Sequence, residues 1–386
     1  MNHEASPSSS NQTLGNNYGS IEEQPLIATK VHGKSSNWDT FLQISCILLG
    51  TGVLQLPAAL KEGGWIGIFY ILLAGVISNY TGILTVRCLY YKEGSRVKTF
   101  SELGRSAFGN RGLLLVKFMK NFALISAGAI FILLAAINLD ALTKLYFGFG
   151  DNIKLWVTIS SILVFIPMLA FKELHESPFL SFFGTFTTVF VIIIVTALSI
   201  IKFLQKDFVL PPSNLFSLKG FPISLSSICF AFGGNLLWPE VEEGMEDPKS
   251  FERVLTLSNG VVTLFYVTVA LTAYLVFGDN VLSPVLLSFE PSIFLDASYM
   301  LIALHVLLTA PMLLMSVSNE IEKDISASDS ENSESRFFTR SALRGVIIII
   351  ASTTVVSLPN FEKLVSFFGS MTSSILSFVS TLIFSF

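Results

Sequence analysis

Ten long apolar segments dominate this sequence and constrain its fold more than any other feature. Most of them reach about 18 residues, the length that a helix needs to cross the hydrocarbon core of a bilayer. Only 13% of the 386 residues are charged, too few to cover the surface of a soluble domain of this size. The sequence therefore predicts an all-α integral membrane protein. Its predicted spans lie near 39–60, 64–90, 113–140, 153–171, 178–203, 219–239, 253–277, 292–317, 341–358 and 361–386.

The segments outside these spans differ from them in composition. Residues 1–38 are polar and rich in Ser, Asn and Gly, so we expect a disordered tail ahead of one membrane domain at 39–386. Two longer polar connections, 91–112 and 319–340, interrupt the domain. The second contains an acidic, Ser-rich run from Asp324 to Glu334, which predicts a flexible loop.

The distribution of Lys and Arg predicts the orientation in the membrane. With the N-terminus in the cytoplasm, the segments on the cytoplasmic side carry 17 of the 24 Lys and Arg residues, and the opposite side carries 7. Because cytoplasmic segments are enriched in positive charge, we expect a cytoplasmic N-terminus. An even number of spans then places the C-terminus on the same side.

The membrane domain divides into two halves of similar length, 39–203 and 219–386. Each half opens with a span that glycine interrupts. We name these interruptions the first break, Gly50–Gly52, and the second break, Gly233–Asn235. Five spans per half make the two halves inverted relative to each other. Broken helices at matching positions of inverted halves are typical of the substrate site of a secondary transporter.

The chemistry of the two breaks suits the backbone of an amino acid. Unwound backbone within a membrane is tolerated where it lines a cavity or binds a ligand. The amide groups at the first break would begin a half-helix and favour a carboxylate, and the carbonyls at the second break would accept from an ammonium group. The predicted substrate-binding residues are Gly50, Thr51, Gly52, Val53, Ala231, Phe232, Gly233 and Gly234.

Two alternatives stay open at these positions. Small residues in membrane helices often serve close helix packing instead of ligand binding. The matching glycine pairs in both halves favour a binding site over packing. Phe232 could form an aromatic gate or face lipid.

The residues around the breaks resemble a known family. The stretch 49–57, read with 61–65, is similar to the first span of the amino acid/auxin permease family, and 232–248 is similar to its sixth span and the following loop. The stretch 358–370 resembles its ninth and tenth spans. That family includes vacuolar amino acid transporters of fungi and plants and lysosomal and vesicular transporters of animals.

This resemblance implies a LeuT-type fold of five plus five inverted spans, with the first and sixth helices broken. It also implies amino acid transport by alternating access, coupled to protons or to sodium. Family members usually have an eleventh span, whereas this chain ends at Phe386 in its tenth. We expect the inverted repeat to be complete without that helix.

Three side chains are candidates for ion coupling. His305 is the ionisable residue nearest the middle of a span, and a histidine there could relay protons or serve as a neutral helix contact. Glu240 could be protonated or form an inner gate, or it could be a solvated carboxylate among Glu242, Glu243 and Glu246. Thr309, with Thr51, could instead bind sodium, as hydroxyls do elsewhere in the fold. We expect proton coupling.

The N-terminal tail contains a possible sorting signal. Glu22, followed after three residues by Leu26 and Ile27, matches an acidic dileucine motif, which endosomal adaptor proteins read. It favours a vacuolar or lysosomal membrane over the plasma membrane.

Other classes of function fit less well. The chain lacks a filter-like repeat or charged ring of a channel and the HExxH, GxSxG or Walker motifs of enzymes. We expect no enzyme activity, cofactor, bound metal or nucleic-acid partner. The partners expected are an amino acid, a coupling ion, the bilayer and sorting adaptors. A transporter-like amino acid sensor and a sodium-coupled symporter of the plasma membrane stay open as alternatives.

Overall fold

The fold is known from a computed structural model, which describes residues 35–50, 52–91, 96–148, 152–170, 178–326 and 333–371. Within these ranges the chain is helical, and the β-type pairing is one isolated bridge between Ser35 and Met245. A further helix occupies 361–371. The other elements are α1 (Asn37–Leu49), α2 (Gly52–Gly63), α3 (Gly67–Leu89), α4 (Phe100–Phe147), α5 (Ile153–Ala170), α6 (Pro178–Phe203), α7 (Phe221–Ala231), η1 (Gly233–Leu237), α8 (Trp238–Glu243), η2 (Pro248–Ser250), α9 (Phe251–Phe277), η3 (Gly278–Asn280), η4 (Val285–Ser288), α10 (Ile293–Ser326) and α11 (Ser333–Ser357).

The helices match the predicted spans closely. Among the described residues, 8 helical spans are long and apolar enough to cross a membrane, and the bent pair α1 and α2 makes up to 9. The fifth predicted span, 178–203, coincides with α6. The helix at 361–371 begins where the tenth span was predicted, and the rest of that span lies outside the described residues. The predicted disordered tail also lies almost wholly outside them.

Short polar motifs set where several helices begin. Ser36 and Asp39 form a capping box at the start of α1, in which each side chain accepts from the other residue's backbone N–H. Thr99 caps α4 through the N–H of Glu102. These caps satisfy amide groups that have no partner in the first turn of a helix.

Both polar connections predicted as loops contain helix. In the connection 91–112, helix begins at Phe100 and is interrupted at Phe108 and Gly109, where Gly109 has a φ of 62° that favours glycine. In the connection 319–340, α10 continues to Ser326 and α11 starts at Ser333, so the predicted flexible loop is partly wrong. Both helices run past their apolar segments into polar sequence, where Glu322 of α10 forms an ion pair with Arg340 of α11.

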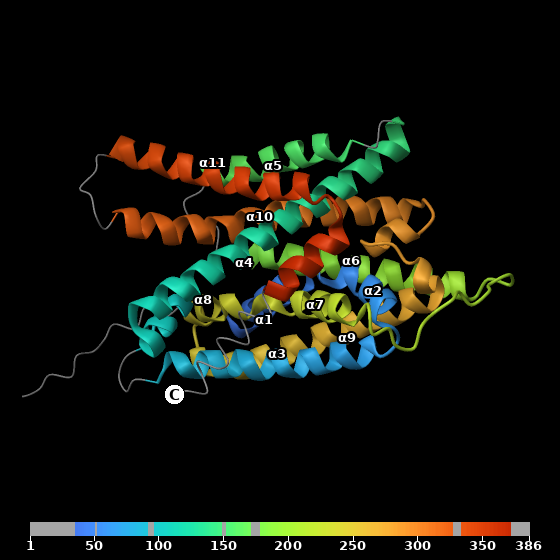
Figure 1. The fold of residues 1–386 in the computed structure, drawn as a ribbon, viewed down its shortest axis with the longest axis horizontal. Helices are drawn as coiled ribbons and strands as arrows, with labels where there is room; N and C mark the ends of the chain where they lie inside the picture. Colours follow the sequence, from blue (N-terminus) through green and yellow to red (C-terminus); the bar gives the residue numbers. More distant parts are fainter. Residues whose placement is uncertain are drawn as a thin grey trace, which may run out of the picture. The chain divides into compact units, whose positions relative to one another are not determined.

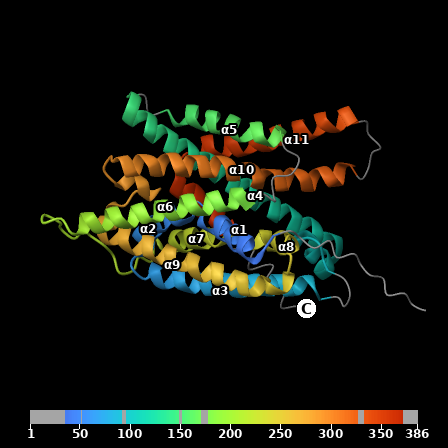
Figure 2. The same ribbon diagram turned by 180° about the vertical axis from the view of Figure 1, so that it is seen from behind.

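The two interrupted spans lie side by side in the middle of the bundle. Figures 1 and 2 show α1, α2, α7 and α8 between a layer of α3 and α9 on one side and α4, α6 and α10 on the other. The helices α5 and α11 lie beyond α10. This arrangement buries both breaks inside the bundle.

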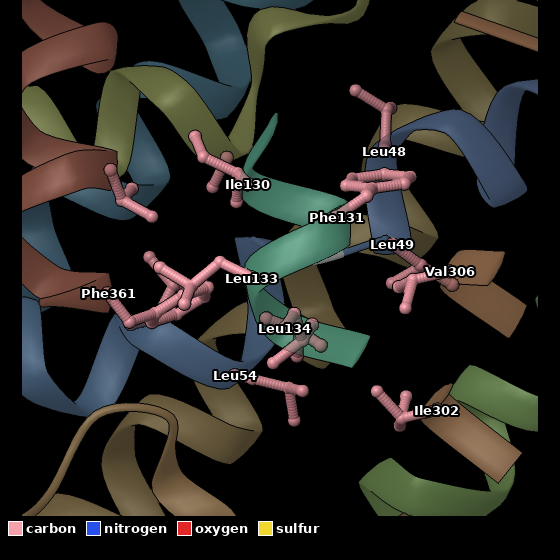
Figure 3. Packing of buried hydrophobic residues seen from close by; sticks show 14 of the residues in the cluster. Leu48, Leu49, Leu54, Ile130, Phe131, Leu133, Leu134, Ile302, Val306 and Phe361 are labelled. Atoms are coloured by element: carbon pink, nitrogen blue, oxygen red, sulfur yellow. The ribbon is translucent and has the colours of Figure 1, made fainter. Parts of the chain in front are cut away.

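Close packing of apolar side chains surrounds the first break. Figure 3 shows residues of α4, from Ile130 to Leu134, against Leu48, Leu49 and Leu54 of the first span. Ile302 and Val306 of α10 and Phe361 belong to the same cluster. Since lipid gives little hydrophobic drive for helix association, such contacts and hydrogen bonds hold the helices together.

Candidate functional site

The first break is an abrupt bend. Helix α1 ends at Leu49, α2 begins at Gly52, and the two helices meet at an angle of 41°. Gly50 is pressed against the aromatic ring of Phe131 on α4, since a Cβ at residue 50 would lie 3.1 Å from its Cζ. Val53, in the first turn of α2, is fully buried. Thr51 lies outside the described residues.

The second break is tighter than an unwound segment. Helix α7 ends at Ala231, and the 3₁₀ helix η1 (Gly233–Leu237) leads directly into α8. A 3₁₀ turn winds the backbone more tightly than an α-helix and leaves the preceding carbonyls without their usual partners. The predicted interruption is therefore present, in the form of a 3₁₀ turn.

The two breaks touch each other through their backbones. A Cβ on Gly52 would lie 2.8 Å from both Cα and Cβ of Ala231. A Cβ on Gly234 would lie 3.1 Å from Cδ2 of Leu48 and 2.8 Å from Cη2 of Trp238. One glycine from each break thus permits a contact that no larger residue allows. The first and second breaks, which the sequence predicted to form one site, are therefore in contact in the structure.

A tyrosine that the sequence analysis missed joins the two breaks. The hydroxyl of Tyr266, in the middle of α9, lies 2.8 Å from the carbonyl oxygen of Ala231 and also reaches the carbonyl oxygen of Leu48. Its side chain is fully buried. A tyrosine in the middle of a mostly apolar span was the signal that could have pointed to it, because a buried hydroxyl needs a hydrogen-bond partner.

Asn235 fastens the second break to α3. Its side-chain amide donates to the hydroxyl of Thr81 at 2.8 Å, and its Oδ1 accepts from Ser78 at 3.3 Å and from the indole of Trp238 at 2.8 Å. The Ser78 hydroxyl also lies 3.4 Å from the carbonyl oxygen of Phe232. These hydrogen bonds of Asn235 were not predicted, although an asparagine in a membrane span is a signal for helix–helix hydrogen bonding.

Phe232 does not face lipid. Only 3% of it is exposed, and its ring packs edge-on against Tyr266 with 5.1 Å between the ring centroids. Of the two alternatives open in the sequence, the lipid-facing one is wrong. A role as a gate stays a prediction.

His305 is buried at the junction of three helices. A Cβ on Gly184 of α6 would lie 2.7 Å from its Cε1 and 2.4 Å from the Sγ of Cys46 on α1. The Nε2 atom of His305 is buried and has no hydrogen-bond partner among the described residues. One turn further along α10, the Thr309 hydroxyl donates to the His305 carbonyl oxygen. The histidine therefore lies beside the first span, with one ring nitrogen unused.

Glu240 is in an ion pair at the end of the sixth span. Its Oε1 lies 2.6 Å from Nζ of Lys120 on α4, whose side chain is only 3% exposed. Glu320 of α10 is the second carboxylate near this ammonium, at 4.0 Å, and accepts from Ser101 at 2.9 Å. Glu240 thus ties α8 to α4 through Lys120, which also lies near α10, and does not stand free in solvent.

Of the neighbouring acidic residues, Glu243 and Glu246 are exposed as in the predicted solvated cluster, and Glu242 is not. Glu242 is fully buried, and its carboxylate accepts from Arg96 at 2.7 Å and from the hydroxyl of Tyr90. Burial, together with this hydrogen bond to Glu242, raises the pKa of Tyr90 to about 12. The chain after α3 is thereby fixed to α8. Of the two glutamates that pair with Arg96, Glu243 is the more exposed.

The electrostatics of the two breaks come from backbone. None of the side chains described here at the breaks carries a charge, and the charged pairs lie at the end of α8. The N-terminus of α2 carries a partial positive charge and the C-terminus of α7 a partial negative one. These opposite partial charges meet at Gly52 and Ala231, an arrangement that complements a small zwitterion.

Comparison with known proteins is consistent with this geometry. A family model described as transmembrane amino acid transporter protein matches residues 33–386. The amino acid transporter AVT1E of Arabidopsis thaliana is 29% identical over 252 residues, which cover 64% of this chain and 46% of that protein. The vacuolar amino acid transporter 3 of Schizosaccharomyces pombe is 25% identical over 358 residues, covering 90% and 53%. The chain thus spans about half the length of these relatives.

The crystal structure of MhsT in complex with L-phenylalanine has a similar fold. It aligns with a TM-score of 0.62 and 12% sequence identity, covering 91% of this chain and 88% of MhsT. The likeness confirms the LeuT-type fold expected from the sequence. The matched family is described as one of transmembrane amino acid transporters.

Proposed function

Because the chain belongs to the transmembrane amino acid transporter family, we propose that it moves amino acids across a membrane by alternating access, driven by protons. The observation that carries the proposal is the backbone contact between the two breaks at Gly52 and Ala231. It sets the amide end of one half-helix against the carbonyl end of another, within a buried and uncharged environment. Such an arrangement matches the carboxylate and ammonium groups that all α-amino acids share.

Each predicted binding residue has a place in this proposal. The amides of Gly52 and Val53 bind the substrate carboxylate, and the carbonyls of Ala231 and Phe232 accept from its ammonium group. Gly50 and Gly234 leave room for neighbouring side chains, the ring of Phe131 at Gly50 and the side chain of Leu48 at Gly234. Gly233 begins the 3₁₀ turn of the second break. Thr51 completes the amide set, on the basis of the sequence alone.

Uptake into proteoliposomes tests this function. We expect labelled amino acids to enter vesicles faster when an inward proton gradient is imposed, and a protonophore to abolish that increase. Exchange of external sodium for choline should leave uptake unchanged. Uptake driven by a sodium gradient would support the sodium-coupled alternative, and binding without flux would support the sensor. The proposal fails if the purified protein neither binds nor moves any amino acid.

We propose His305 as the proton-coupling residue. Its buried ring lies between α6 and α1, next to the first break, and its Nε2 is free to take up a proton. Protonation there adds a charge in a low-dielectric site, which costs free energy unless neighbouring groups rearrange. Because His305 lies beside α1, a rearrangement that lowers this cost would move the first span, and proton binding would thereby be coupled to the conformation of that span.

Variants of His305 test the coupling separately from substrate binding. In His305→Ala we expect the stimulation of uptake by a proton gradient to disappear, while exchange of labelled for unlabelled amino acid continues. Thr309→Val serves as the matched control, because Thr309 lies one turn away on α10 and would bind sodium, not protons. Full pH-dependent uptake by His305→Ala would contradict the role of the histidine.

We propose a vacuolar or lysosomal membrane, with the N-terminus in the cytoplasm. Support comes from the name of the fission yeast relative, a vacuolar amino acid transporter, and from the motif of Glu22, Leu26 and Ile27. The backbone of Ser35 pairs with Gly244 and Glu246, close to the Arg96–Glu242 ion pair. Ser35 therefore lies at the same end of the bundle as Arg96, which belongs to the Lys- and Arg-rich connection that we assign to the cytoplasmic side. Those three motif residues themselves lie outside the described residues.

Replacement of Leu26 and Ile27 by Ala tests the address. We expect the variant to move to the cell surface, because adaptor recognition needs both apolar side chains. Microscopy of a fluorescent fusion measures the change, and replacement of Leu14 by Ala in the same tail is the control. An unchanged location of the double variant would contradict the sorting signal.

A further inference from the structure

Tyr266 contacts three of the helix ends that the two breaks create. Its hydroxyl lies within hydrogen-bond distance of the carbonyl oxygens of Leu48, in the last turn of α1, and Ala231, at the end of α7. The same oxygen would lie 3.0 Å from a Cβ on Gly52, the first residue of α2. One side chain from a third span therefore meets both broken spans.

This contact is the polar link between the first halves of the two broken spans. Among the described residues, no other hydrogen bond joins α1 to α7. A hydroxyl has a single hydrogen, so at any moment it donates to one of the two carbonyls and lies against the other. The ring itself is fixed by its edge-on packing with Phe232. The carbonyl oxygens of Leu48 and Ala231 are thus both held close to the Tyr266 hydroxyl.

We propose that Tyr266 is a positioning residue for the substrate backbone. It holds the ends of α1 and α7 in register, so that the neighbouring backbone groups, the Gly52 amide and the Phe232 carbonyl, keep the spacing that an α-amino acid requires. The residue acts through the backbone and does not bind the substrate itself. This inference rests on the proposed function, since it assigns a task within that same site.

The removal of one oxygen atom tests the inference. Tyr266→Phe keeps the ring and its packing on Phe232 but removes the one hydroxyl donor that the Leu48 and Ala231 carbonyls share. We expect the KM for amino acid uptake to rise about tenfold, with Vmax per folded protein changed by less than about twofold. Such a split between KM and Vmax follows from weaker substrate binding and not from loss of folded protein.

The same helix supplies a matched control. Tyr274 lies two turns further along α9, is also fully buried, and its hydroxyl lies 3.1 Å from Asp279 and accepts from the Asn214 N–H at 3.2 Å. Tyr274→Phe removes an equivalent buried hydroxyl away from the breaks, so we expect its KM to stay near the wild-type value. A thermal unfolding curve for each variant in detergent measures the structural cost of the lost hydrogen bonds separately.

A rescue variant covers the case in which Tyr266→Phe folds poorly. In 4-aminophenylalanine the amino group carries two hydrogens and can donate to both carbonyls, so its incorporation at position 266 should restore a KM within about twofold of wild type. The inference is overturned if Tyr266→Phe and Tyr274→Phe have the same KM, or if the amino variant gives no rescue. Absence of uptake or binding in the wild-type protein would instead contradict the proposed function.

Discussion

The two breaks carry the same sequence signature, a pair of close glycines followed by a proline, yet they are built differently. The first break is a bend of 41° whose neighbours are the apolar ring of Phe131 and the hydroxyl of Tyr266, both from other spans. The second break is a 3₁₀ turn that carries its own polar residue, Asn235, and is fastened by it to α3. Glycine permits the interruption, and the surrounding side chains decide its form.

This difference assigns unlike tasks to the two breaks. Two hydrogen bonds of Asn235 anchor the second break to α3. The ion pairs of Glu240 and Glu242 anchor α8 to α4 and to the chain after α3. By contrast, the C-terminal end of α1 is held, among the described residues, by one side-chain hydrogen bond, from the Tyr266 hydroxyl to the Leu48 carbonyl. We therefore expect variants at the second break to lower stability and variants at the first break to lower transport.

The largest expected effect is that of Gly52→Ala. Its new methyl group would lie 2.8 Å from the backbone of Ala231, which cannot move aside as a flexible side chain would. Overpacking of this kind costs about 3 kcal/mol in the state in which the two breaks are in contact. Because the proposed transport cycle passes through that state, the same cost adds to the transport barrier, and we expect the uptake rate to fall about a hundredfold. Gly260→Ala on α9 is the control, because a Cβ there meets no atom within 4 Å. Equal uptake by the two variants would remove the first break from the site.

Asn235→Leu should destabilise the fold by about 2 kcal/mol. It leaves the Trp238 indole and the hydroxyls of Ser78 and Thr81 without their partner in a buried region. Thermal or denaturant unfolding in detergent measures the loss. Thr81→Val removes one of these bonds and should cost about half as much. A stable Asn235→Leu variant with impaired uptake would reverse the tasks assigned to the two breaks.

The ion pair at the end of α8 should contribute less. A double-mutant cycle with Lys120→Met and Glu240→Gln is expected to give a coupling free energy of about 1.5 kcal/mol, because Lys120 is buried. The more exposed pair of Arg87 and Glu252 should couple more weakly, because solvent screens it. Equal coupling in the two pairs would mean that the α8 anchor is no stronger than a surface contact.

Gly50→Ala should have the smallest effect. The nearest atom to its new methyl group is Cζ of Phe131, at 3.1 Å, and this ring can shift by a few tenths of an ångström. We expect uptake to fall by no more than about threefold. A loss as large as that of Gly52→Ala would show that Phe131 is as rigid as backbone.

The spans were predictable because membrane helices are encoded locally. A bilayer requires long apolar segments, and the fifth predicted span, 178–203, coincides with α6. The glycines of the two breaks were equally visible. The predicted loop after Asn319 was partly wrong, because polarity was read as a loop where α10 instead continues and pairs Glu322 with Arg340.

The partners of the breaks were not predictable from local sequence. Tyr266 lies 35 residues from Ala231 along the chain, and Lys120 lies 120 residues from Glu240. Each pair forms only after the helices have packed. Glu240 was recognised as unusual, but its ion pair required the position of α4. Asn235 was read as part of the glycine signature, although its side chain is what fastens the turn.

A structure of the purified protein with a transported amino acid bound tests the central claim most directly. The account predicts a ligand whose carboxylate lies within hydrogen-bond distance of the Gly52 or Val53 amide and whose ammonium group faces the Ala231 or Phe232 carbonyl. An ordered amino acid that contacts neither break would contradict it.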